Sequence, residues 1–192
     1  MGKRYYRFPL TNLWMIDFNT PGTRTTGEKA ANYLITGPGW KGEVPSGMVH
    51  IPVATRYTVI LGRTYADGSE ADYQAVNALP AQYKITPLAA WGKPYSPAAA
   101  VIDPAPGFSM TDKPQKVILD IGVDGYFNKL AELMCEAAPP AAEDAPILAR
   151  MAQIGLQPCK PFASNTLGAD VQAALKDLPQ AALTQIGANK AR

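Results

Sequence analysis

The chain has 192 residues, of which 47% are hydrophobic and 18% are charged, and its formal net charge is +2. A charge this close to neutral does not indicate a polyphosphate partner, so we expect no nucleic-acid binding. No run approaches the ~20 consecutive apolar residues that span a bilayer, so we expect no membrane span. The length allows one packed core with an appendage.

Short strands are predicted from Tyr5 to about Leu61, because aromatic and β-branched residues alternate with turn residues there. Residues 13–18, 32–36 and 49–53 are expected to be strands, and residues 57–65 form the strongest strand pattern. Turn residues at 19–22 and 37–42 separate these runs. This spacing favours an antiparallel β-sandwich or jelly-roll-like domain over an α/β sheet.

A change of pattern follows the last of these strands. Asp67 and Gly68 predict a turn, and Ser69 is placed to cap a short helix that begins at Glu70. Residues 83–88 are expected to be extended. Residues 92–114 are rich in Pro, Ala and Gly and form an unusually long loop for the interior of a compact domain.

The last third is predicted to be helical. Helices are expected over residues 125–138, from a cap at Asp144 to Gly155, and over residues 170–188, where Pro179 should kink or divide the helix. We therefore expect an α+β fold in three parts. These are a β-rich domain over residues 1–100, a loop or linker over 101–124, and a helical segment over 125–192 that packs on the β domain or on a missing second domain.

The two cysteines, Cys135 and Cys159, do not form a C-x-x-C pair. A disulfide between them would join two helical segments, and two ordinary thiols fit the sequence equally well. The sequence therefore leaves the redox compartment open.

His50 is the only histidine, so any nucleophile–histidine catalysis must use it. An enzyme hypothesis assigns catalysis to His50, Arg63, Tyr57 and Asp67, with Arg63 fixing an anionic group and His50 moving a proton. The reaction would be that of a hydrolase or lyase on a small polar or carbohydrate-like substrate. It requires these side chains to converge, and a strand histidine bonded to its neighbours is the simpler interpretation.

Arginine and tyrosine residues near the strands suggest a ligand surface. Arg24, Trp40 and Arg56 are the candidate ligand-binding residues, because guanidinium groups bind carboxylates bidentately and aromatic rings stack on sugars. Cross-strand structural pairs would use the same residue types. One histidine and scattered carboxylates predict no metal site, and no motif indicates a cofactor.

An ordered series of short motifs resembles one bacterial family. The motifs are Arg4-Tyr5-Tyr6, Leu10-Thr11-Asn12-Leu13-Trp14, Thr26-Gly27, residues 33–42, residues 45–47, residues 60–64, Asp67-Gly68 and residues 82–88. The series is similar to the domain of unknown function 1254 (DUF1254) over about residues 4–100.

The resemblance implies a β-rich domain with no settled activity. Members of the family commonly join this domain to a second β domain, of the unknown-function family 1214 (DUF1214), and often carry an export signal, which implies a periplasmic location. No signal pattern precedes the first strand here, and we expect the chain to be a piece truncated at both ends. With few catalytic residue types beside many aromatics and prolines, the sequence favours a binding or structural module. Such a module would pair with a second β domain or self-associate, and a small-molecule ligand is compatible with it.

Overall fold

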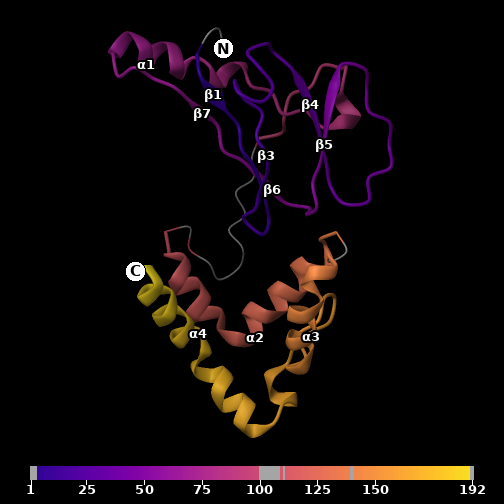
Figure 1. Cartoon of the computed structure of the whole chain (residues 1–192), viewed down its shortest axis with the longest axis vertical. Helices are drawn as coiled ribbons and strands as arrows, with labels where there is room; N and C mark the ends of the chain where they lie inside the picture. Colours follow the sequence, from indigo (N-terminus) through magenta and orange to yellow (C-terminus); the bar gives the residue numbers. More distant parts are fainter. Residues whose placement is uncertain (1–3, 100–108, 110, 139–140, 191–192) are drawn as a thin grey trace. The chain divides into compact units, whose positions relative to one another are not determined.

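The computed structural model describes residues 4–99, 109, 111–138 and 141–190. The chain divides into two compact units, Met1–Ala98 and Ala99–Arg192. Strands occur in the first unit and long helices in the second, so the α+β class is confirmed (Figure 1). Residues 101–108 and 110 of the expected linker lie outside the described residues.

The N-terminal unit contains seven strands among its described residues, in three small open sheets. The strands are β1 (Tyr6–Arg7), β2 (Leu10–Asn12), β3 (Asp17–Asn19), β4 (Asn32–Thr36), β5 (Met48–Pro52), β6 (Thr58–Ile60) and β7 (Arg63–Thr64). The sheets have the orders β1-β7, β3-β2-β6 and β4-β5. The strand predicted over residues 32–36 is confirmed, and β5 begins one residue before its predicted start.

The predicted strand over residues 57–65 is wrong as one element, because it is split into β6 and β7. Opposite the break lie Phe8 and Pro9. Pro9 has no N–H to give to a ladder, and its carbonyl accepts from Leu61 N at 3.1 Å. A Cβ on Gly62 would come within 2.6 Å of the Phe8 ring, so the glycine makes room for that ring. The two strand pairs, β1-β7 and β2-β6, therefore continue one another across a bend.

The strand predicted over residues 13–18 is also wrong, because its first half is the turn between β2 and β3. Asn12 builds this turn. Its side-chain oxygen accepts from the N–H groups of Trp14 and Ile16 at 3.0 and 3.1 Å, and its backbone carbonyl accepts from Met15 N at 3.0 Å. Met15 adopts a left-handed φ of 61° at the tip.

The expectation of purely antiparallel sheets is wrong for β4 and β5, which pair in parallel from Asn32↔Met48 to Thr36↔Pro52. Parallel neighbours need a connection long enough to return to the start of the next strand. The loop over residues 37–47 supplies it, with Gly39 and Gly47 at φ values of 75° and 79° that suit glycine. The sandwich is not formed by these open sheets.

The short helix α1 (Glu70–Asn77) is confirmed with its cap, since the Ser69 side chain accepts from Asp72 N. An ion pair between Arg4 and Asp72 joins the start of β1 to α1. The same carboxylate accepts from Asp67 N at 2.8 Å. Residues 83–87 form no strand, and 3-10 turns occur at Pro80–Gln82 and Leu88–Ala90.

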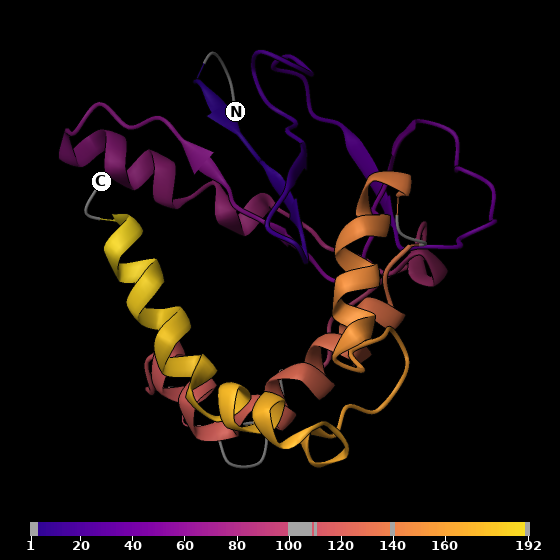
Figure 2. The same cartoon turned by 60° about the horizontal axis from the view of Figure 1, so that its bottom comes forward.

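The helical unit contains α2 (Pro114–Cys135), α3 (Ala145–Gln153) and α4 (Ala169–Lys190), with α4 beside α2 in both Figure 1 and Figure 2. The predicted start at residue 125 is wrong, because α2 begins at Pro114, whose fixed φ suits a first helical position. Gly122 breaks α2 with a φ of 65°, so only its second half matches the predicted helix. The helical assignment of α4 continues through Pro179 without dividing.

Asp144 does not cap α3 with its side chain; its carboxylate accepts from Ala141 N at 3.1 Å, in a 3-10 turn over Ala142–Asp144. Gly155 ends α3 as expected, with a φ of 81°. The buried core of this unit consists of Ala131, Leu156, Phe162 and Leu175.

A single stripe along α2 holds the segment that leads into α4. Asp124, Asn128, Ala131 and Cys135 lie four, three and four residues apart, which places them on one helix face. Asp124 accepts from Ser164 N at 3.0 Å, and Ala131 O accepts from Cys159 N at 3.1 Å.

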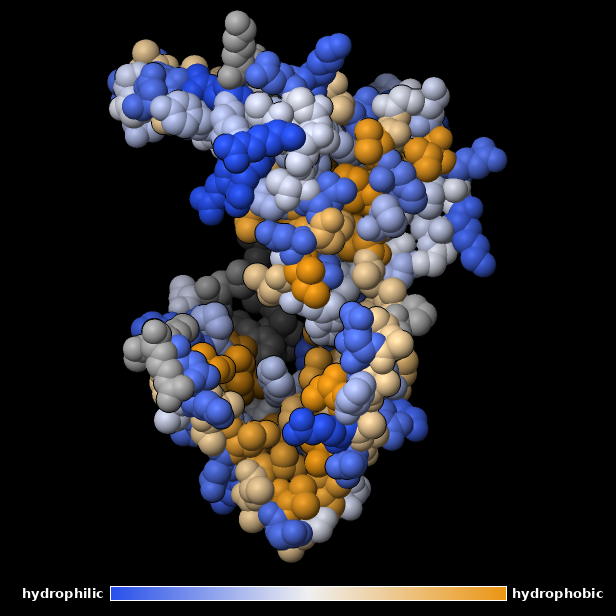
Figure 3. Space-filling view, viewed as in Figure 1, coloured by the Kyte–Doolittle hydropathy of each residue, from blue (hydrophilic) through white to orange (hydrophobic). Residues whose placement is uncertain are grey.

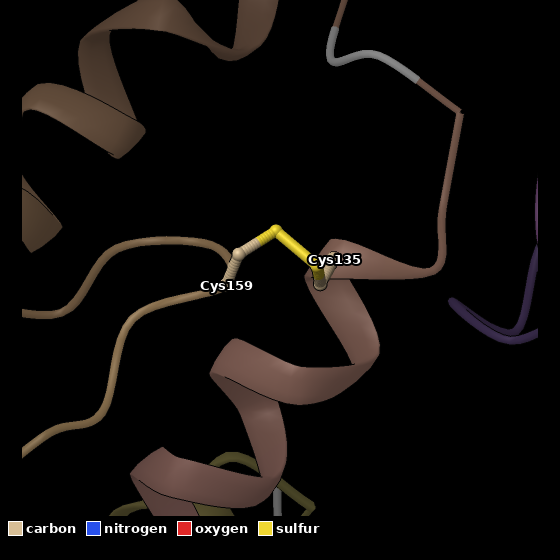
Figure 4. Close-up of a disulfide and its surroundings, with 2 residues drawn as sticks. All are labelled: Cys135 and Cys159. Atoms are coloured by element: carbon tan, nitrogen blue, oxygen red, sulfur yellow. A yellow bond between two sulfur atoms is a disulfide. The ribbon is translucent and has the colours of Figure 1, made fainter.

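The Asn128 side chain forms hydrogen bonds with both backbone polar groups of Phe162 in that segment. Its side-chain oxygen accepts from Phe162 N at 2.9 Å, and its amide donates to Phe162 O at 2.8 Å. The Cys135–Cys159 disulfide closes the stripe (Figure 4). The alternative of two free thiols is therefore not what the structure contains.

The Asp72 carboxylate should make the N-terminal unit sensitive to acid. The hydrogen bond from Arg4 holds the pKa of Asp72 below its usual value, so its stabilisation is present above the unfolded pKa and is lost as pH falls through the lower folded pKa. We expect Asp72→Asn to melt at a lower temperature than the wild type at pH 7, and the difference to disappear in strong acid. Trp14, Trp40 and Trp91 all lie in this unit, so tryptophan fluorescence measures its melting. Glu70→Gln, in the same helix turn, should show no such difference.

The disulfide should stabilise the helical unit. It joins residues 24 positions apart, and closing a loop of that length in the unfolded chain corresponds to about 3 kcal/mol. We expect the Cys135→Ser, Cys159→Ser variant to lose about that much unfolding free energy, measured by circular dichroism in urea. The fluorescence transition of the N-terminal unit should not move. An unchanged helical transition would contradict the assignment.

Candidate functional site

The seven candidate residues that the sequence predicts do not form one site. His50 lies on β5 and Trp40 in the loop before it, and their ring centroids are 5.2 Å apart. Arg63 lies on β7, on the opposite side of the N-terminal unit from β5 (Figure 1). The structure therefore brings Trp40 to His50 and does not bring Arg63 to either.

Asp67, Tyr57 and Arg56 lie in turns or bends at the surface. Asp67 accepts from Ser69 N at 2.8 Å, which is the turn role that its sequence predicts. Tyr57 is an exposed residue just before β6, and its carbonyl accepts from the Thr55 hydroxyl at 2.7 Å. Arg56 is exposed in the same bend. The catalytic grouping of His50, Arg63, Tyr57 and Asp67 stays a prediction, with its members on separate elements.

The imidazole of His50 has a defined environment. Its Nε2 shares a hydrogen bond of 2.8 Å with Oγ1 of Thr36, which lies on β4 two residues beyond Leu34, the register partner of His50. Trp40 is held in place because it lies against Gly42, where a Cβ would come within 2.5 Å of the indole ring. The arrangement presents one aromatic ring and one imidazole at the surface, fixed by a buried threonine.

A second surface lies on the solvent face of β1 and β7. Tyr6 is buried and Arg7 is exposed, so alternate residues of β1 point to the core and to solvent. Arg7 is directly opposite Arg63 in the register. Two residues along, Tyr5 is opposite Tyr65, and Tyr65 N donates to Tyr5 O at 2.9 Å.

The segment on the other side of β1 adds a third arginine. Gly22 bridges to Arg7, and the antiparallel run continues with Thr23 N donating to Tyr6 O at 3.1 Å. The next residue, Arg24, lies over the Tyr5 ring at 5.5 Å from its centroid. We call the set of Tyr5, Arg7, Arg24, Arg63 and Tyr65 the arginine–tyrosine face.

This face could not be found from the sequence alone. Arg24 and Arg63 stand out in the sequence because they flank strands, but no sequence pattern groups Arg7, Tyr5 and Tyr65 with them. Their grouping depends on the register of β1 with β7. The alternation Tyr5, Arg7 and Arg63, Tyr65 is a signal that becomes visible only once that pairing is known.

Two open grooves lie in the helical unit. The first has a volume of about 610 Å³ along α2 beside the disulfide, and the second has about 500 Å³ between α2 and α4. The first is bordered by the Lys129–Glu132 ion pair. Among the described residues, His, Cys, Asp and Glu form no group of three that would hold a metal ion, and no helix is both long and apolar enough to cross a bilayer.

Comparison with known families identifies the first unit. The sequence profile of the family described as "Protein of unknown function (DUF1254)" matches residues 1–87. Residues 1–87 belong to the DUF1254 family. The resemblance expected over about residues 4–100 is thereby confirmed as far as residue 87, and the arginine–tyrosine face lies wholly inside the DUF1254 segment.

The fold of the chain is similar to that of a solved structure. It is the crystal structure of the VPA0106 protein from Vibrio parahaemolyticus, at 18% identity and a TM-score of 0.64. The match covers 95% of this chain and 42% of VPA0106, so the chain spans less than half the length of that protein. No curated protein matches the sequence.

The arginine–tyrosine face should depend on Gly22. A Cβ at this position would lie 2.7 Å from Tyr6 O and 3.0 Å from the Arg7 Cα, which is backbone and cannot move aside easily. We expect Gly22→Ala to destabilise the N-terminal unit by about 1–3 kcal/mol, as overpacking does. Urea unfolding followed by tryptophan fluorescence measures it. Gly37→Ala is the control, since nothing lies within 4 Å of a Cβ there, and an equal loss in both variants would refute the steric account.

Proposed function

We propose that the chain is a scaffold module that binds a second β domain, and that the turn between β2 and β3 is its main contact. Trp14, Met15 and Ile16 at this turn are exposed, Met15 by 79%. Apolar side chains held in water are typical of protein contacts. This turn is the observation that carries the proposal.

The turn is rigid, which favours a role in recognition. The three hydrogen bonds that Asn12 accepts fix its backbone, and Leu13 N donates to Oγ1 of Thr55 at 3.0 Å. Thr55 is 1% exposed, so the anchor lies inside the unit. A rigid apolar tip loses little conformational freedom when a partner covers it.

The edges of the adjacent sheet offer a second contact. In the order β3-β2-β6, both β3 and β6 are outer strands, and outer strands carry unpaired N–H and C=O groups. Val59 and Ile60 are neighbours on β6 and point to opposite faces, yet both are exposed. Figure 3 shows hydrophobic side chains at the surface of the N-terminal unit, near the place of β3 and β6 in Figure 1. A partner strand or sheet would cover both faces.

A second β domain is the occupant that we favour. The match covers 42% of VPA0106, so more than half of that protein lies outside the matched part. The DUF1254 resemblance implies a neighbour of the DUF1214 type, and adding its strands would complete the jelly-roll-like arrangement that the open sheets lack. The disulfide supports an oxidising, periplasm-like location, since such bonds persist there.

An enzymatic role, as a hydrolase or lyase on a small polar substrate, has one observation in its favour. The Thr36 hydroxyl contacts the only imidazole, that of His50. Arg63, Tyr57 and Asp67 lie on other elements, which leaves this pair without the groups that the hypothesis gave it. A binding module is therefore the better-supported proposal.

The turn contact is tested by mixing the chain with a purified DUF1214 domain in sedimentation velocity experiments. We expect a complex, and we expect Met15→Asp to weaken it at least about tenfold, as loss of an apolar anchor does. Aspartate tolerates a positive φ, so the melting temperature of the chain should not change.

Ile147→Asp on α3 is the matched control and should bind as the wild type does. A Met15→Asp variant that binds with unchanged affinity would contradict the proposed contact. A wild-type chain that forms only homodimers would contradict the choice of partner.

A further inference from the structure

We propose that the arginine–tyrosine face binds an acidic carbohydrate, with the carboxylate of a uronic acid held between Arg7 and Arg63 and the sugar ring lying on Tyr65. This site is separate from the turn between β2 and β3 and does not depend on the proposed partner domain.

The face is a small lattice of two rows. Gly22, Arg7 and Arg63 form the first row, and the second consists of Arg24, Tyr5 and Tyr65. Gly22 is buried and has no side chain, so only backbone lies beside Arg7 at this end of the first row. Arg24 already covers one ring, that of Tyr5, while Tyr65 is 59% exposed.

The three arginines of the face have no carboxylate partner among the described residues. In the described part of the chain, no carboxylate forms an ion pair with Arg7, Arg24 or Arg63. Two like charges directly opposite each other on neighbouring strands are unfavourable. A carboxylate between them removes that repulsion and accepts the paired N–H groups of a guanidinium in the bidentate manner that arginine favours.

The exposed tyrosine of this face indicates that the ligand carries a sugar ring beside its carboxylate. A tyrosine ring has an apolar face and a polar hydroxyl, which fits a sugar ring with its C–H face and its rim of hydroxyl groups. The face is a sheet surface rather than a deep pocket, so it suits a residue within an extended chain. These features together select an acidic polysaccharide over an isolated inorganic anion.

The binding test uses the whole chain and isothermal titration calorimetry with tetragalacturonate. Galactotetraose, which has the same length and no carboxylates, should bind at least tenfold more weakly. Arg63→Gln and Arg7→Gln should each weaken tetragalacturonate binding at least tenfold, and Arg63→Lys should fall between them and the wild type because it keeps the charge and loses the fork. Binding should weaken as salt is raised, since ion pairs at the surface are screened.

Matched variants distinguish binding at this face from a general effect of the net charge of the protein. Arg150→Gln on α3 removes the same charge from an exposed position in the other unit and should bind normally. Tyr65→Ala should weaken binding severalfold, and Tyr95→Ala, also an exposed tyrosine, should not. Tryptophan fluorescence melting of each variant shows whether the N-terminal unit is folded.

Three results would overturn the proposal. The first is no saturable binding of tetragalacturonate at millimolar concentration. The second is equal affinity of the folded Arg7→Gln and Arg63→Gln variants and the wild type. The third is equal binding of galactotetraose, or tighter binding of single-stranded DNA, which would assign the face to another class of ligand.

Discussion

The pairing of the first strands with the strands around residue 60 is the constraint on which the N-terminal unit depends. β1 pairs with β7 and β2 with β6, and the two ladders meet at a bend shaped by Pro9 and Gly62. The first ladder aligns arginine with arginine and tyrosine with tyrosine on its outer side. The second supports the rigid turn after β2. Two separate surfaces are thus set by one register, and a shift of one residue would turn every side chain of a strand to the other face.

Local chemistry was enough to predict some elements. β4, the capped start of α1 at Ser69 and the end of α3 at Gly155 follow from signals within a few residues. The helix break at Gly122 and the early start of α2 at Pro114 were missed, although proline and glycine are themselves the signals. The proline- and alanine-rich composition of the preceding residues favours a loop and hides the start of the helix.

Other features depend on contacts between distant residues and were beyond the sequence. The split between β6 and β7 depends on a phenylalanine more than fifty positions away, and the parallel direction of β5 depends on the path of a loop that has no periodic pattern. The candidate site shows the same division. Arg24 and Arg63 stand out in the sequence as arginines that flank strands, and their functional roles stay predictions, whereas their grouping with Tyr5, Arg7 and Tyr65 emerges only from the register. The grouping of His50 with Arg63 had no such support.

The bond between Cys135 and Cys159 has one more consequence for the helical unit. All of α3 lies between these two residues, so it is enclosed in a covalent ring. A protease that cuts the chain once inside this ring leaves two fragments still joined through sulfur, and both still carry their side of the Asn128–Phe162 contact. Nicked and intact molecules would migrate together on a denaturing gel until a reducing agent is added, so the ring protects the integrity of the unit against damage to its own loop.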